Sequence, residues 1–194
     1  KSQNIKIEHY YSSFQLRANH TMEIIKKILN DNSNFVKAWQ LNERHYGALT
    51  GLNKIEMTKK IGEDKVYELR RSWDKRPDPL SKDSPYHPQN IETYKKIPKE
   101  VIPDTESLKD TYDRVLKYFK EEVQNELLKK NILITAHGNS IRALCKYLFQ
   151  LDNEQISKLE IPTGNPLIIQ FDEKLNIINS KYLDKERAKS LLVY

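Results

Sequence analysis

Residues 41–54, LNERHYGALTGLNK, are the first candidate for a catalytic segment, because a histidine lies there between basic residues and a glutamate. An arginine beside a histidine, as at Arg44 and His45, can act as a phosphate clamp with its nucleophile. Tyr46 follows the pair, however, and the preceding FVKAWQ is a mixed run rather than a buried apolar strand. Glu43 is therefore the better candidate, because a carboxylate placed against a substrate hydroxyl can exchange a proton.

A second histidine follows the clearest strand signal in the chain. Residues 131–136, NILITA, form a short β-branched run typical of a buried parallel strand, and His137 comes directly after it. The next residues, Gly138-Asn139-Ser140, lead into the helix-like stretch IRALCKYLFQ. A strand, a tight turn and a helix N-terminus present backbone N–H groups to an anion. Gly138 lets the backbone approach a ligand closely, so the sequence predicts a site at His137.

Arg70 and Arg71 are the third candidate. Neighbours within a continuous helix point about 100° apart, so one ligand rarely meets both side chains. Ser72, Trp73 and Pro77 indicate that the helix ends here, and at a helix end both guanidinium groups can turn inward as an anion clamp. Two solvated arginines are the alternative interpretation.

The elements that must position these residues alternate between helices and strands, which predicts an α/β fold. We predict helices over residues 16–30, 54–70 (one helix or two), 105–128 and 141–150, a strand over 131–136, and a hairpin of 166–171 with 175–179. Ser12-Ser13 is the expected cap of the first helix, and Asp104 or Thr105 that of the 105–128 helix. Six of the eight prolines lie between Pro77 and Pro103, so we expect short turns there and a substrate-covering role.

Composition narrows the class of protein. With 38% hydrophobic and 31% charged residues, the 194 residues have the balance of one soluble globular domain. Residues 37–76 hold ten basic and six acidic side chains, an excess that favours an anionic partner. Nucleic acid is the weaker choice because aromatic residues do not interleave the basic ones. No apolar run is long enough to span a membrane. The single cysteine, Cys145, fits a helix core in a reducing cytosol. The sequence shows no metal-ligand spacing.

Five segments together resemble the cofactor-dependent phosphoglycerate mutases of the histidine phosphatase superfamily. They are LNERHYGALTGLNK (41–54), RRS (70–72), ESLKDT (106–111), AHGNSIRAL (136–144) and IPTGNP (161–166). The resemblance covers nearly all of the chain. It implies a three-layer α/β/α fold with a mostly parallel sheet, in which residues 54–103 form a helical and Pro-rich insert over the site. It also implies interconversion of 3- and 2-phosphoglycerate in glycolysis and gluconeogenesis, primed by 2,3-bisphosphoglycerate, by a cytoplasmic homodimer or homotetramer that needs no metal, nucleic acid or membrane.

The resemblance further implies a role for each candidate residue. Glu43 exchanges a proton with the substrate hydroxyl, and His137 stabilises the transferring phosphoryl group. The positions implied to bind phosphate or carboxylate, or to line the same pocket, are Arg17, Arg44, His45, Tyr46, Lys54, Arg70, Arg71, Gly138 and Asn139. A bisphosphoglycerate mutase, a histidine-type phosphatase and a non-catalytic phosphoglycerate-binding relative stay open as alternatives.

The sequence departs from this family in one respect. The family carries its phosphoryl group on a histidine in an Arg-His-Gly motif after the first strand, and the 194 residues contain no such motif. We therefore interpret residues 1–194 as a single, N-terminally incomplete domain that lacks the first strand, the nucleophile loop and the first helix. A shortened, inactive relative is the alternative. Because the absent strand belongs inside the sheet, we expect the 194 residues alone to fold poorly.

Overall fold

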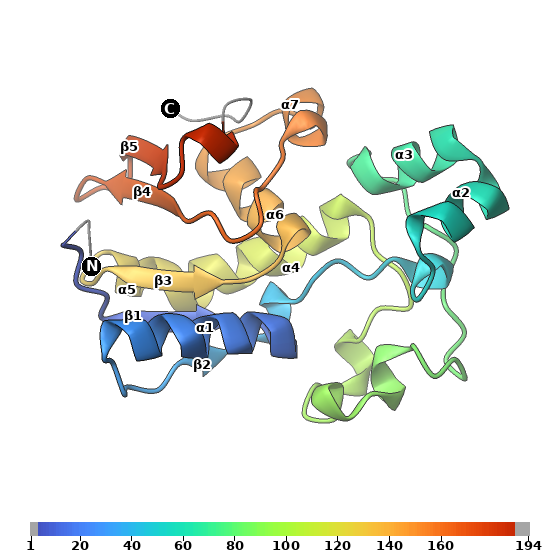
Figure 1. Ribbon diagram of the computed structural model, residues 1–194, viewed down its shortest axis with the longest axis horizontal. Helices are drawn as coiled ribbons and strands as arrows, with labels where there is room; N and C mark the ends of the chain where they lie inside the picture. Colours follow the sequence, from blue (N-terminus) through green and yellow to red (C-terminus); the bar gives the residue numbers. More distant parts are fainter. Residues whose placement is uncertain (1–3, 189–194) are drawn as a thin grey trace.

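A three-stranded parallel sheet stands at the centre of the protein (Figure 1). The computed structural model describes residues 4–188, apart from the side chain of Lys54. The strands lie in the order β2 (Val36–Lys37), β1 (His9–Ser12) and β3 (Ile132–Thr135), and both neighbours run parallel to β1. Their carboxyl ends therefore meet at one edge, where loops after parallel strands place their functional side chains.

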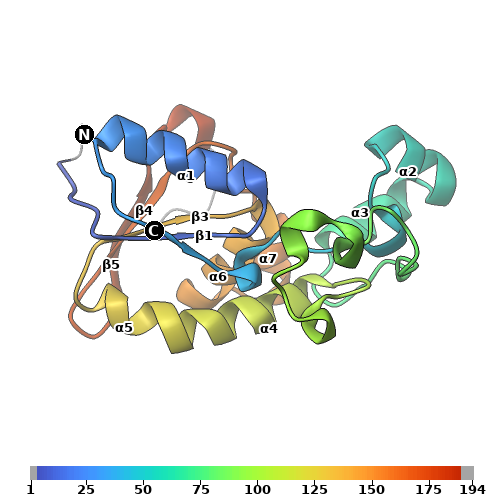
Figure 2. The same ribbon diagram turned by 90° about the horizontal axis from the view of Figure 1, so that it is seen from below.

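Helices cover both faces of this sheet, as Figure 2 shows. On one face lies α1 (Leu16–Leu29), and Thr135 Oγ1 donates to the carbonyl of Ala18 over 3.1 Å. The other face carries α4 (Leu108–Tyr118), a π-helical turn (Phe119–Val123), α5 (Gln124–Leu127) and α6 (Gly138–Leu148). The buried core on that face consists of Tyr11, Ala38, Leu41, Tyr118, Phe119 and Val123. The three-layer α/β/α prediction is confirmed.

Strand β1 has no counterpart among the predicted strands. Its two tyrosines point to opposite faces, as alternation along a strand requires. Tyr11 joins the core beneath α4, and Tyr10 donates to Asp31 Oδ2 over 2.6 Å on the α1 side. Ser12 ends this strand, so the predicted Ser12-Ser13 cap is wrong, and Gln15 occupies the N-cap position of α1. Four residues are too few for the alternation to stand out in the sequence.

The C-terminal part forms an antiparallel pair, and the predicted hairpin is confirmed. After α7 (Asn153–Lys158), β4 (Leu167–Phe171) pairs with β5 (Ile177–Tyr182). Within residues 4–188, β4 pairs with β5 alone and β3 with β1 alone, so each sheet keeps an unpaired edge. The chain ends its described part with a 3₁₀ turn at Glu186–Ala188.

Residues between β2 and α4 project from one end of the sheet (Figure 1). Two 3₁₀ turns, Trp39–Leu41 and Gly47–Leu49, precede α2 (Lys54–Ile61) and α3 (Glu63–Arg71), so the pair of helices is confirmed. The proline-rich segment that follows contains only 3₁₀ turns, at Pro88–Asn90, Glu92–Tyr94 and Lys99–Val101, as expected. The cap of α4 is Ser107 in a capping box with Asp110, so the expectation of Asp104 or Thr105 is wrong.

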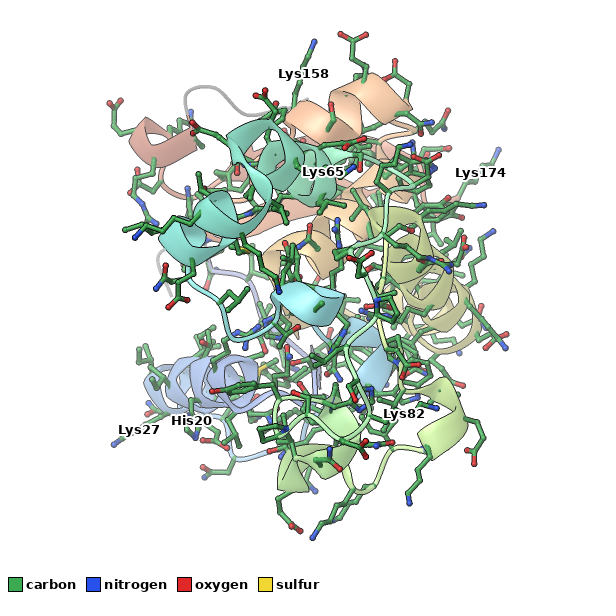
Figure 3. All side chains as sticks on the ribbon, turned by 90° about the vertical axis from the view of Figure 1, so that its right-hand side faces the viewer. His20, Lys27, Lys65, Lys82, Lys158 and Lys174 are labelled. Atoms are coloured by element: carbon green, nitrogen blue, oxygen red, sulfur yellow. The ribbon has the colours of Figure 1, made fainter. Side chains whose placement is uncertain are left out.

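Most lysines lie on the outer surface. Figure 3 shows Lys27, Lys158 and Lys174 pointing away from the ribbon. Lys65 pairs with Glu68 over 2.6 Å on α3, an exposed ion pair of the kind that contributes at most about 1 kcal/mol. Across residues 4–188, no helix is both long and apolar enough to cross a membrane.

Candidate active site

A cavity of about 490 Å³ opens where the loops leave the carboxyl ends of β1 and β2. Six of the predicted site residues line it, namely Arg17, Glu43, Arg44, His45, Tyr46 and Arg70. Another part of its wall is apolar and comes from the proline-rich segment, including Tyr86, Ile91, Ile97 and Pro103. The cavity therefore joins a cationic floor to an apolar cover.

His137 occupies the N-cap position of α6, two residues after β3 ends at Thr135. Its Nε2 lies 2.8 Å from Ser13 Oγ, so the loops after β3 and β1 meet in one hydrogen bond. The residue is buried, and burial together with the positive charges of Arg17 and Arg114 lowers the pKa of the imidazole to about 3. His137 is therefore neutral near pH 7 and retains one ring N–H to donate.

Asn139 connects the start of α6 to the LNERHYG loop. Its backbone N–H donates to Glu43 Oε1 over 3.3 Å, and its side-chain amide donates to the hydroxyl of Tyr46 over 2.8 Å. Arg142, one turn further along α6, donates to Asn139 Oδ1 over 3.0 Å and so fixes the orientation of that amide. The Tyr46 hydroxyl accepts this bond and keeps its own proton for a ligand.

Arg44 enters the interior and leaves part of its guanidinium group unsatisfied. The residue is 2% exposed, Nη2 donates to the carbonyl of Leu69, and the group lies 4.8 Å from the centre of the Tyr46 ring. Nε and Nη1 find no hydrogen-bond partner within the described chain. Burial lowers the pKa of this arginine, yet a guanidinium group stays charged. Buried cationic donors without partners suit an anionic ligand.

His45 lines the same cavity, but one of its ring nitrogens is already engaged by the backbone. Its Nδ1 accepts the Gly47 N–H over 3.1 Å, which leaves the proton of the neutral ring on Nε2. Nε2 is buried and lacks a partner among residues 4–188, and burial lowers the pKa of the ring. His45 lines the cavity, and its ring lies close to the backbone of Asp104 and to the ring of His87.

The remaining predicted residues differ in how closely they approach the cavity. Arg17 is exposed and donates to Gln15 Oε1 over 3.3 Å. Arg70 lines the cavity, whereas Arg71 pairs with Glu160 instead, so the two arginines of the predicted clamp point to different partners. A Cβ on Gly138 would meet no described atom within 4 Å, which leaves its face open to a ligand. Lys54 begins α2, and its side chain lies outside the described part of the structure.

Four residues of the site were not found by sequence reasoning. Ser13 binds His137, and Gln15 Oε1 accepts the Glu43 N–H over 3.0 Å. Glu106 and Arg114 form a buried ion pair in the cavity wall. The signal for Arg114 was a cation beside the buried positions of an amphipathic helix, a placement that normally requires a partner.

The described residues contain no group of three or more His, Cys, Asp or Glu side chains that could hold a metal ion. The convergent groups are instead guanidinium, imidazole, amide and hydroxyl donors around one carboxylate. Such a set has the chemistry that suits a polyanionic ligand and proton exchange with it.

Comparison with known proteins identifies relatives of this chain. The family profile of the histidine phosphatase superfamily (branch 1) matches residues 1–89 and 80–182. The 2,3-bisphosphoglycerate-dependent phosphoglycerate mutase of Pelagibacter ubique is 65% identical over all of this chain and 82% of its own length. The enzyme of that name from Borreliella afzelii is 49% identical over 91% of this chain and 72% of its own length.

Solved structures support the fold. Bacillus stearothermophilus YhfR superposes with a TM-score of 0.62 at 17% identity, over 90% of this chain and 73% of its own. The alpha-ribazole phosphatase of Shigella flexneri superposes with a TM-score of 0.61 at 15% identity, over 93% of this chain and 73% of its own. With the family profile and the mutase relatives, these findings show that the chain belongs to the histidine phosphatase superfamily and, within it, to the 2,3-bisphosphoglycerate-dependent phosphoglycerate mutases.

Proposed function

We propose that this site interconverts 3-phosphoglycerate and 2-phosphoglycerate. The observation that carries the proposal is the hydrogen bond from the Asn139 N–H to Glu43 Oε1, which places a carboxylate at the start of the helix that His137 caps. A carboxylate beside a phosphoryl-stabilising imidazole is what a transfer between two neighbouring hydroxyl groups requires. One group exchanges the hydroxyl proton, and the other binds the phosphoryl oxygens.

The cationic residues bind and orient the substrate. Arg44 offers Nε and Nη1, which have no partner in the described part of the chain, from a buried position. Arg17 and Arg70 add positive charge at the cavity surface. Tyr46 and Asn139 add neutral donors. Phosphoryl transfer depends chiefly on positioning and on stabilising negative charge, and these residues supply both.

The same donors fit the cofactor that the relatives' name gives. Two nitrogens of Arg44, Nε and Nη1, lack partners among the described residues and suit a ligand with several negative charges. Arg17, Arg44, Tyr46 and Arg70 would hold 2,3-bisphosphoglycerate, with Lys54, Arg71, Gly138 and Asn139 as further predicted contacts. When bound, this compound supplies the phosphoryl group that primes a histidine, and no metal is part of the proposal. We place the reaction in cytoplasmic glycolysis and gluconeogenesis, in a homodimer or homotetramer.

The test compares the full-length gene product with its Glu43→Gln variant. Conversion of 3-phosphoglycerate into 2-phosphoglycerate is followed by coupling to enolase, release of inorganic phosphate is measured in parallel, and cofactor affinity is measured by calorimetry. We expect the variant to lose about 10²- to 10⁴-fold in kcat while its cofactor affinity stays within a few-fold, because the amide keeps the size but cannot exchange the proton. Phosphate release without interconversion in the unsubstituted protein would favour a phosphatase, and cofactor binding without turnover a binding protein.

A further inference from the structure

A buried ion pair lies in the cavity wall behind Glu43. Arg114 donates from Nε to Glu106 Oε1 over 2.6 Å and from Nη2 to Glu106 Oε2 over 2.9 Å. The two side chains are 11% and 4% exposed, so water screens this pair little. The fork of the guanidinium group matches the carboxylate, a geometry that a lysine cannot reproduce.

The remaining donors and acceptors of this pair bind the backbone of the loop that carries Glu43. Arg114 Nη1 donates to the carbonyl of Gln40 over 2.6 Å, and Nη2 also donates to the carbonyl of Glu43 over 3.3 Å. In the other direction, the His45 N–H donates to Glu106 Oε2 over 2.8 Å, and the Glu106 N–H donates to the carbonyl of His45 over 2.9 Å. The pair thus fixes the loop on both sides of the Glu43 side chain.

The helix that carries Arg114 also supports the other half of the site. Leu108, the first residue of α4, packs with Cys145 of α6 in one buried cluster. His137 caps α6, and Asn139 in its first turn binds Glu43. Helix α4 therefore contacts both the loop that carries Glu43 and the helix that begins after His137.

We propose that Arg114 and Glu106 are positioning residues that hold the Glu43 carboxylate against the substrate hydroxyl, an inference that rests on the mutase function proposed above. Neither side chain needs to touch the reacting atoms. The pair acts through the backbone of residues 40–45. This role requires the planar, two-pronged guanidinium group of Arg114 and not its positive charge alone.

The discriminating variant is Arg114→Lys, which keeps the charge and removes the fork. Its matched control is Arg76→Lys. Arg76 makes a bidentate pair with Asp110, also on α4, but its own side chain is 59% exposed. In the full-length enzyme we expect Arg114→Lys to lower kcat about 10- to 100-fold with KM within a few-fold of the unsubstituted value, because a small misplacement of a reacting group is costly. Arg76→Lys should keep the unsubstituted kcat.

A double-variant cycle separates positioning from general destabilisation. When Glu43→Gln has already removed the proton-exchanging group, adding Arg114→Lys should reduce kcat less than about threefold further, since residues that act as a unit are not additive. If Arg114→Lys does not yield folded protein, Glu106→Gln, which keeps the acceptor for the His45 N–H, takes its place in the same cycle. An unchanged kcat, or a full additional loss on top of Glu43→Gln, overturns the inference. An unsubstituted enzyme without interconversion would overturn the proposed function as well, so the two failures differ.

Discussion

Arg44 carries a positive charge into the interior of the protein, where it meets the carbonyl of Leu69 and the ring of Tyr46. Leaving buried donors unpaired costs about 1–3 kcal/mol each. An arrangement of this kind lowers the stability of the ligand-free protein and strengthens the binding of an anion that satisfies the donors. The residue thus exchanges stability for affinity at a functional site.

His137 shows the same compromise through its pKa. Burial holds the folded-state pKa at about 3, well below the ordinary value of 6.5. Between these two values the unfolded chain binds a proton that the folded chain excludes, so the free energy of unfolding falls as the pH is lowered from 6.5. A bound phosphate would favour the protonated ring and weaken this dependence.

We therefore predict a pH-dependent loss of stability that His137 causes. Between pH 7.5 and pH 5, the free energy of unfolding should fall by about 2 kcal/mol more in the unsubstituted protein than in His137→Gln, as measured by urea denaturation. His20→Gln is the control, because His20 is an exposed histidine on α1 (Figure 3). The free energy of unfolding of His20→Gln should fall by as much as that of the unsubstituted protein. Equal losses in all three proteins would contradict the prediction.

At the scale of elements, the turn at Gly47 joins the Glu43 loop to the proline-rich segment. Gly47 has a φ of +54°, and a Cβ there would lie 2.1 Å from the carbonyl oxygen of Asp78 and 2.7 Å from Thr105 Oγ1. The next residue, Ala48, donates its N–H to that same carbonyl over 2.7 Å. The close approach holds the cover of the cavity against its floor.

Gly47→Ala should therefore destabilise the protein by about 2–4 kcal/mol. Alanine disfavours the left-handed backbone, and its Cβ would push the Gly47 turn away from the segments that carry Asp78 and Thr105. Gly164→Ala is the matched control. Gly164 has a φ of +67°, but a Cβ there meets no described atom within 4 Å, so it should cost about 1 kcal/mol from the backbone alone. Urea unfolding compares the two variants, and equal destabilisation would show that the contact with Asp78 contributes nothing.

Elements with a strong local pattern were predictable, and those defined by distant contacts were not. Strand β3 and helix α6 follow from an apolar β-branched run and the turn at His137. Strand β1 escaped prediction because Tyr10 and Tyr11 are buried by helices on opposite faces of a sheet that the local sequence does not reveal. The cap of α4 was misplaced because Asp104, an equally good capping residue, binds His87 instead.

The same distinction applies to the site. Eleven site residues were predicted, and six of them line one cavity, whereas His137, Gly138 and Asn139 are not among its lining residues. Arg114 was missed because its importance lies in the carbonyls of Gln40 and Glu43, more than 70 residues away. The separation of Arg71 from Arg70 depends on Glu160, which only the folded chain brings near.

At the scale of the whole molecule, the two sheets each present an unpaired edge within residues 4–188. Ile132, Leu133 and Ile134 of β3 are only half-buried, although they make up three of the four residues of this strand. An apolar strand with free N–H and C=O groups is a template for pairing with another chain.

We predict that the 194 residues as printed, produced alone, associate in an open-ended way. Analytical ultracentrifugation over about 1–100 μM should show species that keep growing with concentration, accompanied by binding of an apolar dye, because an exposed edge is satisfied by adding another strand. A closed dimer or tetramer of constant size, with no dye binding, would show that the edge of β3 is protected.

The register of the central sheet also governs how the protein reaches its active form. Ser12 of β1 and Thr135 of β3 are hydrogen-bonded partners 123 residues apart, and the loops after these strands supply Ser13 and His137. Closing so long a stretch of chain costs entropy before any contact offsets it, whereas helices such as α1 and α4 form from local contacts. We therefore expect the site to form only when β1 and β3 pair, so that activity depends on this long-range contact.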